Sequence, residues 1–387
     1  MILTPQSMKG AVMTTLDELF GPGRLQEEID AGRVRRGRSG DGLSIFNYTE
    51  TCQYGHHWNE VTLRCRGLIA DDVTGEILAW PFPKFFNHSE HGHGNPWAPD
   101  LPDEPFTVYD KVDGSLGIVF WDRRQERWRA ASRGSFASEQ AQWAQAWIDR
   151  ADEFGRPVSS RLCVGSTYLA EIVYPENRIV VNHGNRRDLV LLGVYGRLGD
   201  ELPLDALMVD WMSIGSVVRS WPQMPLDVLV ELAGRSADIH GMVRTGTDME
   251  GYVLRYRSGR RVKIKLTEYI RMHAILTGMN ERTIWEVLAN GGSLDDLLAN
   301  VPDEFMRWVQ DVADRLRQAH AEKVLAANVA YAAITNKALR KEFAQEAIPT
   351  GLSSMLFRLY DGKSIEEMAW KMVKPSGTAT FSSTEGE

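Results

Sequence analysis

The order of apolar and polar residues changes character once along the chain. From about residue 40 to 270, short apolar segments alternate with Gly, Asn and Pro, a pattern typical of β-strands joined by turns. Residues 137–154 instead carry apolar residues at helical spacing, and we expect a helix whose Trp143 and Trp147 pack in the core. Helical periodicity then continues almost throughout residues 268–373. The pattern predicts an α+β chain with a β-rich part followed by an all-helical part.

We place the domain boundary after residue 267. The predicted units are a β-rich domain over residues 1–267 and a helical domain over residues 268–374, whose helices are separated by Gly- and Pro-containing breaks. The last residues, 375–387, are small and polar, and we expect this tail to be disordered. A length of 387 residues agrees with two or three domains.

Composition excludes several classes of protein. No apolar run approaches the roughly 20 residues of a membrane helix, and the N-terminus lacks the features of a secretory signal, so we expect a cytoplasmic protein of a cell or of a virus-infected host, without a membrane partner. Cys52, Cys65 and Cys163 are odd in number and widely separated, which favours reduced thiols. The formal net charge is −8, so any RNA or nucleotide site must be a local basic patch. Two runs are candidates: Arg33, Arg35, Arg36 and Arg38, and further along Arg255, Arg257, Arg260, Arg261, Lys263 and Lys265.

Candidate chemistry begins at Lys111-Val-Asp-Gly-Ser115, which stands between two β-type runs at residues 106–109 and 116–120. The motif places a lysine at a strand-to-strand turn. Lys-x-Asp-Gly is the nucleophile site of enzymes that attach a nucleotide to their own lysine. Alone, the string favours an ordinary Asp-Gly bend, because Asp-Gly supplies turns with positive φ.

A lysine pair lies in a predicted hairpin formed by residues 250–256 and 261–266. Because alternate residues of a strand share a face, Lys263 and Lys265 would project together while their apolar neighbours enter a core. An exposed strand face is the simpler explanation of a lone Lys-x-Lys. Beside a nucleophilic lysine, however, such charges would favour its neutral amine and stabilise an anionic phosphate in the transition state.

Two strand-borne carboxylates complete the candidates. Glu171 lies in the middle of an apolar run at residues 166–174, and Glu250 begins the first strand of the hairpin. Burying an unpaired carboxylate costs several kcal/mol, so Glu171 should face a cationic partner or a polar pocket. A structural salt bridge is an equally good explanation for either glutamate.

In chain order, these motifs resemble those of the phage-type RNA ligase 1 family. The matching order and spacing cover residues 45–275, and the helical tail suits the family although it carries no motif of it. The resemblance implies an antiparallel-sheet nucleotidyltransferase domain, the ATP-grasp-like adenylation domain of ligases, followed by an all-helical domain that helps to choose the RNA. The series is Arg66-Gly67, Lys84 to Asn87, Lys111 to Leu116, Ser132 to Ser135, Glu171 with Pro175 to Val180, Glu250-Gly251, and Val262 to Lys265 with Tyr269 and His273.

The resemblance also implies an activity, that of an ATP-dependent RNA ligase of the covalent nucleotidyltransferase superfamily. Lys111 would attack the α-phosphate of ATP and form lysyl-AMP, the AMP would pass to an RNA 5′-phosphate, and an RNA 3′-hydroxyl would displace it. The expected cofactors are ATP and Mg²⁺. The expected partner is RNA with 5′-phosphate and 3′-hydroxyl ends, cleaved tRNA among the candidates, and the protein is expected to act as a monomer.

Individual residues receive roles from the same resemblance. Lys263 and Lys265 would contact the α-phosphate and the leaving pyrophosphate, and Arg66 and Lys84 the β- and γ-phosphates. Glu171 and Glu250 would bind the ribose or adenine, or hold a water on Mg²⁺. The nucleotide pocket would be shaped by Asp113 and Gly114, with Tyr48 as a candidate to stack on adenine. Arg133 stands where the family often has lysine, so its contact with the nucleotide is an open question.

Three alternatives remain. A DNA ligase or an mRNA-capping guanylyltransferase shares the lysine motifs, but each continues into a small β-barrel where this chain turns helical. A noncatalytic RNA-binding homologue is disfavoured because every charged motif position keeps a usable side chain.

The histidines of His88-Ser-Glu-His91-Gly-His93 are interpreted as a solvated loop rather than a metal site.

Overall fold

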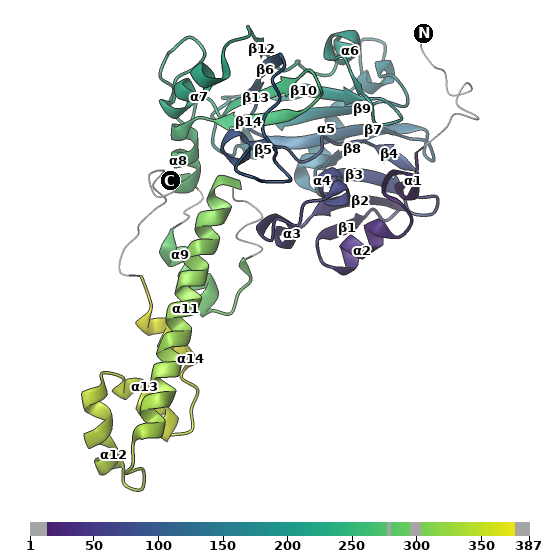
Figure 1. The fold of residues 1–387 in the computed structure, drawn as a ribbon. Helices are drawn as coiled ribbons and strands as arrows, with labels where there is room; N and C mark the ends of the chain where they lie inside the picture. Colours follow the sequence, from purple (N-terminus) through teal and green to yellow (C-terminus); the bar gives the residue numbers. More distant parts are fainter. Residues whose placement is uncertain (1–13, 277–279, 295–302, 376–387) are drawn as a thin grey trace. The chain divides into compact units, whose positions relative to one another are not determined.

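The computed structural model describes residues 14–276, 280–294 and 303–375 (Figure 1). The chain forms two units, residues 1–273 and 274–387, so the first unit ends at His273 rather than at the expected residue 267. The expected disordered tail, apart from Pro375, lies outside the described residues.

Three sheets build the first unit, and nearly all of their strands pair antiparallel. The α+β prediction, with antiparallel sheets followed by helices, is confirmed. One sheet has the order β1-β2-β3-β4, the second β11-β10-β9-β7-β8, and the third β12-β6-β13-β14-β5, in which only β14 and β5 run parallel. The strands are β1 Val34–Arg38, β2 Leu43–Tyr48, β3 Arg66–Asp71, β4 Ile77–Ala79, β5 Phe86–Asn87, β6 Phe106–Lys111, β7 Ser115–Asp122, β8 Arg127–Ser132, β9 Thr167–Val173, β10 Asp188–Tyr195, β11 Glu201–Leu202, β12 Ser220–Trp221, β13 Gly251–Tyr256 and β14 Arg261–Lys265.

Short helices flank these sheets, and one of them corrects the sequence prediction. The helix expected over residues 137–154 is α5, which spans only Glu139–Ile148. Beyond it, Asp152 Oδ1 accepts hydrogen bonds from the backbone nitrogens of Phe154 and Arg156, both at 2.9 Å, and this local turn replaces the helix. The other helices are α1 Leu16–Phe20, α2 Arg24–Asp30, α3 Glu50–Tyr54, α4 Glu60–Arg64, α6 Leu204–Trp211, α7 Leu226–Gly234 and α8 Thr267–Leu276.

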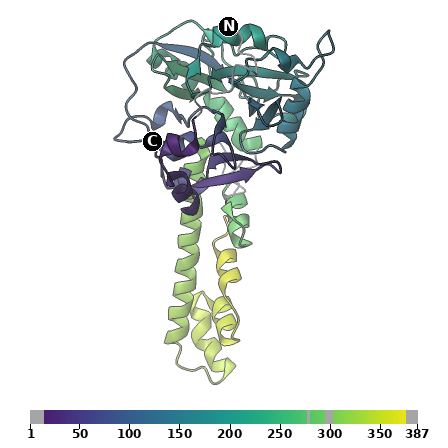
Figure 2. The same cartoon turned by 90° about the vertical axis from the view of Figure 1, so that its right-hand side faces the viewer.

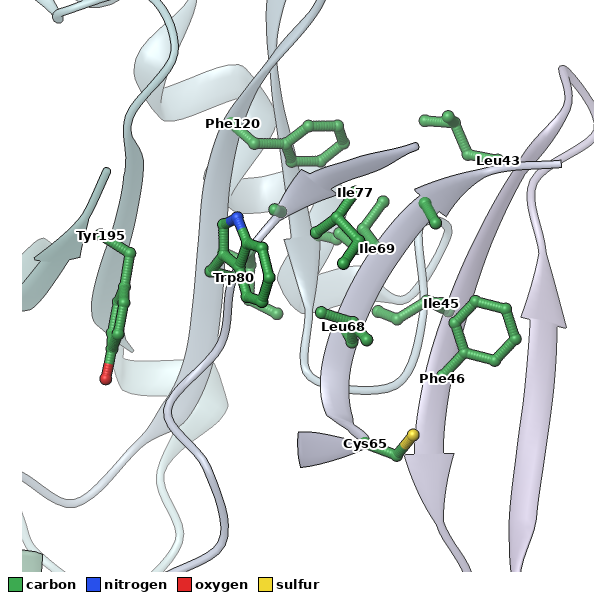
Figure 3. Packing of buried hydrophobic residues seen from close by; sticks show 14 of the residues in the cluster. Leu43, Ile45, Phe46, Cys65, Leu68, Ile69, Ile77, Trp80, Phe120 and Tyr195 are labelled. Atoms are coloured by element: carbon green, nitrogen blue, oxygen red, sulfur yellow. The ribbon is translucent and has the colours of Figure 1, made fainter. Parts of the chain in front are cut away.

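Buried apolar side chains join the first two sheets. Figure 3 shows Phe120 of β7 beside Ile69 and Ile77 of the first sheet, and all three are at most 2% exposed. Burying each such side chain contributes about 1.5–3 kcal/mol. Trp143 and Trp147 of α5 stack with ring centroids 4.7 Å apart and pack against a second core, which confirms their expected structural role.

The third sheet has one apolar face and one polar face. Tyr252, Leu254, Val262 and Ile264 are buried against Leu229 of α7 and Tyr269 of α8. The alternation of side chains therefore directs Lys263 and Lys265 to the opposite face, as predicted.

The second unit is helical throughout its described regular structure. Its long helix α11, Asp303–Ala333, lies beside α13, Ser353–Tyr360, and α14, Glu366–Met372 (Figure 2). The remaining helices of this part are α9, Glu281–Ala289, and α12, Arg340–Ala347. Among the helices described in either unit, none is both long and apolar enough to cross a bilayer. The three cysteines are free, as expected.

Candidate active site

Two lysines and one glutamate meet at the end of the third sheet. In the strand register, Gly251 of β13 pairs with Lys111 on one side and with Lys265 on the other. The Nζ atoms of these lysines lie 2.7 Å and 3.3 Å from Oε1 of Glu250, whose residue is only 3% exposed. A carboxylate paired twice in this way both neutralises and orients the two ammonium groups.

Gly251 permits this close arrangement of strands. Its φ is +151°, and a Cβ added to it would lie 2.1 Å from the carbonyl oxygen of Ile264. No residue with a side chain fits that space. The Glu250-Gly251 motif thus places a carboxylate beside the lysines and removes the side chain that would separate them.

Glu171 approaches the same lysine from the second sheet. It lies in β9, opposite Leu116 of β7. Burial raises the pKa of its carboxyl to about 8, with Lys111 opposing the rise and the carboxylates of Glu250 and Asp113 adding to it. Of the two expected surroundings, a cationic partner or a polar pocket, the structure provides cationic neighbours, Lys111 and Arg66, which favour the ionised carboxylate of Glu171.

Replacing Glu171 by glutamine should stabilise the protein increasingly as the pH rises from about 4.5 to about 8. The ordinary pKa is 4.5, so between pH 4.5 and about 8 the unfolded chain is ionised at this position while the folded chain is protonated. Wild-type stability therefore falls as pH rises through this window, and the variant lacks that loss. We expect the variant's free energy of unfolding to exceed that of the wild type by nearly zero at pH 4 and by on the order of 3 kcal/mol at pH 9, as measured by urea unfolding. A gain in stability that does not change with pH would contradict the raised pKa of Glu171.

Asp113 is occupied within the protein. Its Oδ2 accepts hydrogen bonds from the backbone nitrogens of Val180 and Val181 at 2.8 and 2.7 Å, and its Oδ1 accepts one from the Tyr269 hydroxyl at 2.7 Å. The residue is 4% exposed. Asp113 thus acts on the site by tying the segment at residues 180–181 and helix α8 to the Lys111 turn.

Gly114 is required by close packing. A Cβ there would lie 2.6 Å from the carbonyl oxygen of Ile172, next to Glu171 in β9. The turn after Lys111 therefore passes directly over the strand that carries Glu171. This contact explains the glycine of the Lys-x-Asp-Gly motif without invoking an Asp-Gly bend of positive φ.

Aromatic rings surround the ammonium group of Lys84. Its Nζ lies 5.4 Å from the ring centroid of Tyr48 and 5.3 Å from those of Trp58 and Phe86, and the residue is 8% exposed. Cation–π attraction holds such an ammonium in place. We call Tyr48, Trp58 and Phe86 the aromatic box. Tyr48, expected to stack on adenine, belongs to this box and meets Trp58 edge-on at 5.0 Å.

The remaining motifs are joined to the site through backbone pairing. Asn87 of β5 pairs with Lys263 of β14, which brings the Lys84 segment to the lysine strand. The Arg133 nitrogen donates to the Leu116 carbonyl at 3.0 Å, and a Cβ on Gly67 would lie 3.1 Å from the Arg133 carbonyl oxygen. Arg66 places its guanidinium carbon 5.5 Å from the Phe85 ring centroid. The structure thus gathers the motifs around one region, while nucleotide contacts of the Arg66 and Arg133 side chains remain predictions.

Lysine usage in the first unit points to the same place. Between residues 14 and 273, lysine occurs only at positions 84, 111, 263 and 265, although arginine is frequent. All four lysines belong to the motif series. An ammonium can lose its proton and act as a nucleophile, whereas a guanidinium stays protonated, so this distribution suits amine chemistry.

The two basic runs expected to form an RNA-binding patch are partly paired with carboxylates. In the first run, Arg33 bonds Glu28 and Arg36 bonds Asp72, at 2.6 and 2.7 Å. In the second, Arg255 and Arg261 share Glu201, at 2.7 and 2.6 Å. These pairs explain much of the positive charge structurally.

Sequence reasoning also missed Trp58, whose only signal is its aromatic character in a His-rich loop.

A metal site built by protein side chains alone is not found in the described part of the chain. No group of three or more His, Cys, Asp or Glu residues there is arranged to hold an ion. His91 Nδ1 instead contacts the Pro99 carbonyl oxygen at 3.0 Å.

Comparisons with known proteins agree with the motif series. The model of an RNA ligase family matches residues 64–269, more than half of the chain. A protein of Autographa californica nuclear polyhedrosis virus, provisionally named a bifunctional polynucleotide kinase/RNA ligase, is 23% identical over 75% of this chain and 42% of its own length. A provisionally named RNA ligase of Thermovibrio ammonificans is 23% identical over 61% of this chain and 60% of its own length. The chain thus spans less than two thirds of the length of each relative.

One solved structure aligns over most of the chain. An archaeal ATP-dependent RNA ligase is 12% identical, with 88% of this chain and 96% of that chain covered at a TM-score of 0.43. The family match, together with the motifs that it contains, decides the family. The chain belongs to the RNA ligase family.

Proposed function

We propose that this protein is an ATP-dependent RNA ligase that joins 5′-phosphate and 3′-hydroxyl RNA ends through a lysyl-AMP intermediate. The observation that carries the proposal is the position of Lys111, whose Nζ lies 2.7 Å from Glu250 at a strand end shared with Lys265. The lysine is held but remains 23% exposed, so a nucleotide can reach it. The names of the two relatives, both of which include RNA ligase, support the same activity.

In the first step, the neutral amine of Lys111 attacks the α-phosphorus of ATP. A P–N bond forms, the bond to the bridging oxygen breaks, and pyrophosphate leaves with that electron pair. The amine must release a proton, and Glu250 Oε1 offers an acceptor at hydrogen-bond distance. Lys263 and Lys265, on the same strand face, supply positive charge where negative charge develops.

The later steps reuse the same site. An oxygen of the RNA 5′-phosphate attacks the α-phosphorus and breaks the P–N bond, which frees Lys111. The RNA 3′-hydroxyl then attacks the 5′-phosphorus of the adenylated end, and AMP leaves. Each step is an in-line displacement, for which positioning and charge stabilisation supply most of the catalysis.

Mg²⁺ fits this site as a companion of the triphosphate. Mg²⁺ neutralises phosphate charge and usually keeps several waters with few protein ligands. Glu171 would hold it, directly or through water, and the bound cation would displace the proton that the carboxyl otherwise keeps at neutral pH. Glu250 is a weaker candidate because its Oε1 is paired with two lysines.

Incubation with α-labelled ATP and Mg²⁺, followed by denaturing electrophoresis, tests the proposal. Label should remain on the protein when ATP is the only substrate. It should move to a 5′-phosphorylated RNA when that RNA is added, and it should leave the RNA as AMP when ligated or circular RNA forms. Labelled GTP in a parallel reaction distinguishes a capping guanylyltransferase, and 5′-phosphorylated nicked DNA distinguishes a DNA ligase. RNA binding without any labelled protein would identify a noncatalytic homologue and reject the ligase.

We also propose a biological role. Ends of this kind arise when RNA is cut and its termini are repaired, so we assign the protein to RNA repair, with cleaved tRNA as one substrate. We expect it to act in the cytoplasm and as a monomer. The helical unit would contribute to the choice of RNA. Rates of ligation on nicked tRNA, nicked duplex and free single strands would rank these substrates.

Trp58 should control the use of ATP through Lys84. Replacing Trp58 by leucine removes one wall of the aromatic box and about 1 kcal/mol of cation–π attraction, so Lys84 is held less well for the β- and γ-phosphates. We expect the KM for ATP in self-adenylation to rise about fivefold to tenfold. Sealing of pre-adenylated RNA, which needs no triphosphate, serves as the reference. Trp97→Leu is the matched control because Trp97 stacks on His56 rather than on Lys84. If Trp58→Leu impaired self-adenylation and the sealing of pre-adenylated RNA equally, the proposed role of Trp58 in the use of ATP would be contradicted.

A further inference from the structure

A pocket lies beside the proposed nucleophile, Lys111. Its volume is about 310 Å³, and Lys111 and Glu250 form part of its wall. Asp110 and Lys111 are the last two residues of β6 and both line the pocket, which therefore lies at the end of that strand. The lysines expected to hold the triphosphate, Lys84, Lys263 and Lys265, do not line it. The pocket therefore adjoins the proposed ATP site, with which it shares Lys111, Asp113 and Glu250.

Three arginines from separate segments converge on this pocket: Arg186, Arg219 and Arg244. We call it the arginine pocket. Arg186 precedes β10, Arg219 precedes β12, and Arg244 follows α7. No sequence run contains them together, and the folded sheet alone brings them to one place.

The acidic residues of the pocket wall already accept hydrogen bonds or ion pairs. Asp238 accepts from Arg244 and from the backbone nitrogens of His240 and Met242. Asp110 accepts from Trp221 Nε1 at 2.5 Å, and Asp113 and Glu250 are occupied as described above. The lone pairs of these four carboxylates are thus largely directed at protein donors, which reduces their repulsion of an anion. The fifth carboxylate of the wall, exposed Asp248, accepts a hydrogen bond from the Thr245 backbone nitrogen at 3.2 Å.

Arg219 is the arginine best prepared for a ligand. Its guanidinium carbon lies 3.6 Å from the ring centroid of Trp221, and the residue is exposed. Among the described residues, no carboxylate lies within ion-pair distance of it. Stacking fixes the guanidinium plane while its N–H groups stay open at the edge, the arrangement that arginine uses to bind phosphate.

Neighbouring groups are fixed in place. Arg186 is held by Asp188 at 2.8 Å and by Ser216 at 2.9 Å and remains 41% exposed. His183 Nε2 donates to the Asp113 carbonyl oxygen at 2.8 Å, which connects the pocket wall to the Lys111 turn. Donors held before a ligand arrives lose less entropy on binding.

We propose that the arginine pocket binds a backbone phosphate of the RNA strand whose 5′ end reacts at Lys111. This inference rests on the proposed ligase function and extends it by assigning a contact to the RNA rather than to ATP. RNA is favoured over a free nucleotide because the pocket adjoins Lys111 but is not lined by Lys84, Lys263 or Lys265, the lysines expected to hold the triphosphate. A chain of net charge −8 also needs local cationic sites to hold a polyanion, and part of the charge of the two basic sequence runs is paired with carboxylates.

Arg219→Ala tests the proposal. The probe is a 5′-phosphorylated single-stranded RNA of 12 nucleotides, with the Kd measured by fluorescence anisotropy at several salt concentrations. We expect the Kd to rise about tenfold and the slope of log Kd against log salt to fall by about one phosphate contact. Arg219→Lys, which keeps the charge but not the planar fork, should recover part of the affinity. Exposed Arg127 of β8, outside the pocket, provides the matched control Arg127→Ala with wild-type affinity.

Self-adenylation by ATP separates the possible outcomes. A tenfold loss of RNA affinity with self-adenylation changed less than twofold supports the arginine pocket. Unchanged RNA affinity in Arg219→Ala, or a loss of self-adenylation equal to the loss of RNA affinity, overturns it. If the wild type never becomes adenylated but Arg219→Ala still binds RNA more weakly, the ligase proposal fails and the RNA contact stands. Competition by inorganic phosphate as strong as by RNA would assign the pocket to a free anion and reject the strand contact.

Discussion

Lys111→Ala is expected to lose adenylation by ATP altogether, with the rate falling by a factor of roughly 10⁴ or more. The substitution removes the only amine at the end of β6, and neither Lys263 nor Lys265 can take its place without leaving β14. Lys265 remains paired with Glu250 at 3.3 Å, so the carboxylate is not left without a cation. The loss should therefore be chemical rather than a failure to fold. Transfer of label from α-labelled ATP to protein measures it directly.

A second substrate distinguishes loss of the nucleophile from misfolding of the active site. Pre-adenylated RNA enters after the lysine step, so Lys111→Ala should still seal it at a measurable rate. Exposed Lys363 of the helical unit gives the matched control Lys363→Ala, with label equal to the wild type. Mass spectrometry can locate the adduct, because between residues 14 and 273 only four positions are lysine. An AMP adduct on Lys263 or Lys265 of the wild type would contradict the assignment.

Local patterns predicted the parts of the site that lie within one strand or one turn. The hairpin of β13 and β14 is confirmed, because alternation of apolar and polar residues fixes which side chains share a face. The same rule placed Lys263 and Lys265 together. The position of Lys111 next to a turn also followed from the two apolar runs around it. The family motifs then predicted an antiparallel-sheet fold, which the structure confirms.

Features that depend on distant residues could not be predicted in this way. The aromatic box joins Tyr48, Trp58 and Phe86, and the arginine pocket joins residues 186, 219 and 244. Which segments meet depends on sheet order and loop closure, and neither leaves a periodic signal in one sequence. The end of α5 was missed for a different reason, since hydrogen bonds from the backbone to Asp152 overrode a helical pattern.

Asp113→Ala is expected to destabilise the first unit by about 3–5 kcal/mol and to abolish adenylation with it. The carboxylate accepts three hydrogen bonds within the protein, from two backbone nitrogens and from Tyr269. Removing it leaves three buried donors without an acceptor, each at about 1–3 kcal/mol, although partial hydration would reduce the sum. Urea unfolding followed by tryptophan fluorescence measures the loss.

Tyr269→Phe gives the comparison that identifies the mechanism. It removes one of the three donors and leaves the carboxylate bound to Val180 and Val181, so we expect a loss of only about 1 kcal/mol. Adenylation should then continue, because the turn that holds Lys111 stays tied to the segment at residues 180–181. If Asp113→Ala unfolded within 1 kcal/mol of the wild type yet lost adenylation, the carboxylate would act on the nucleotide itself. The internal hydrogen bonds would then not explain why the aspartate belongs to the motif.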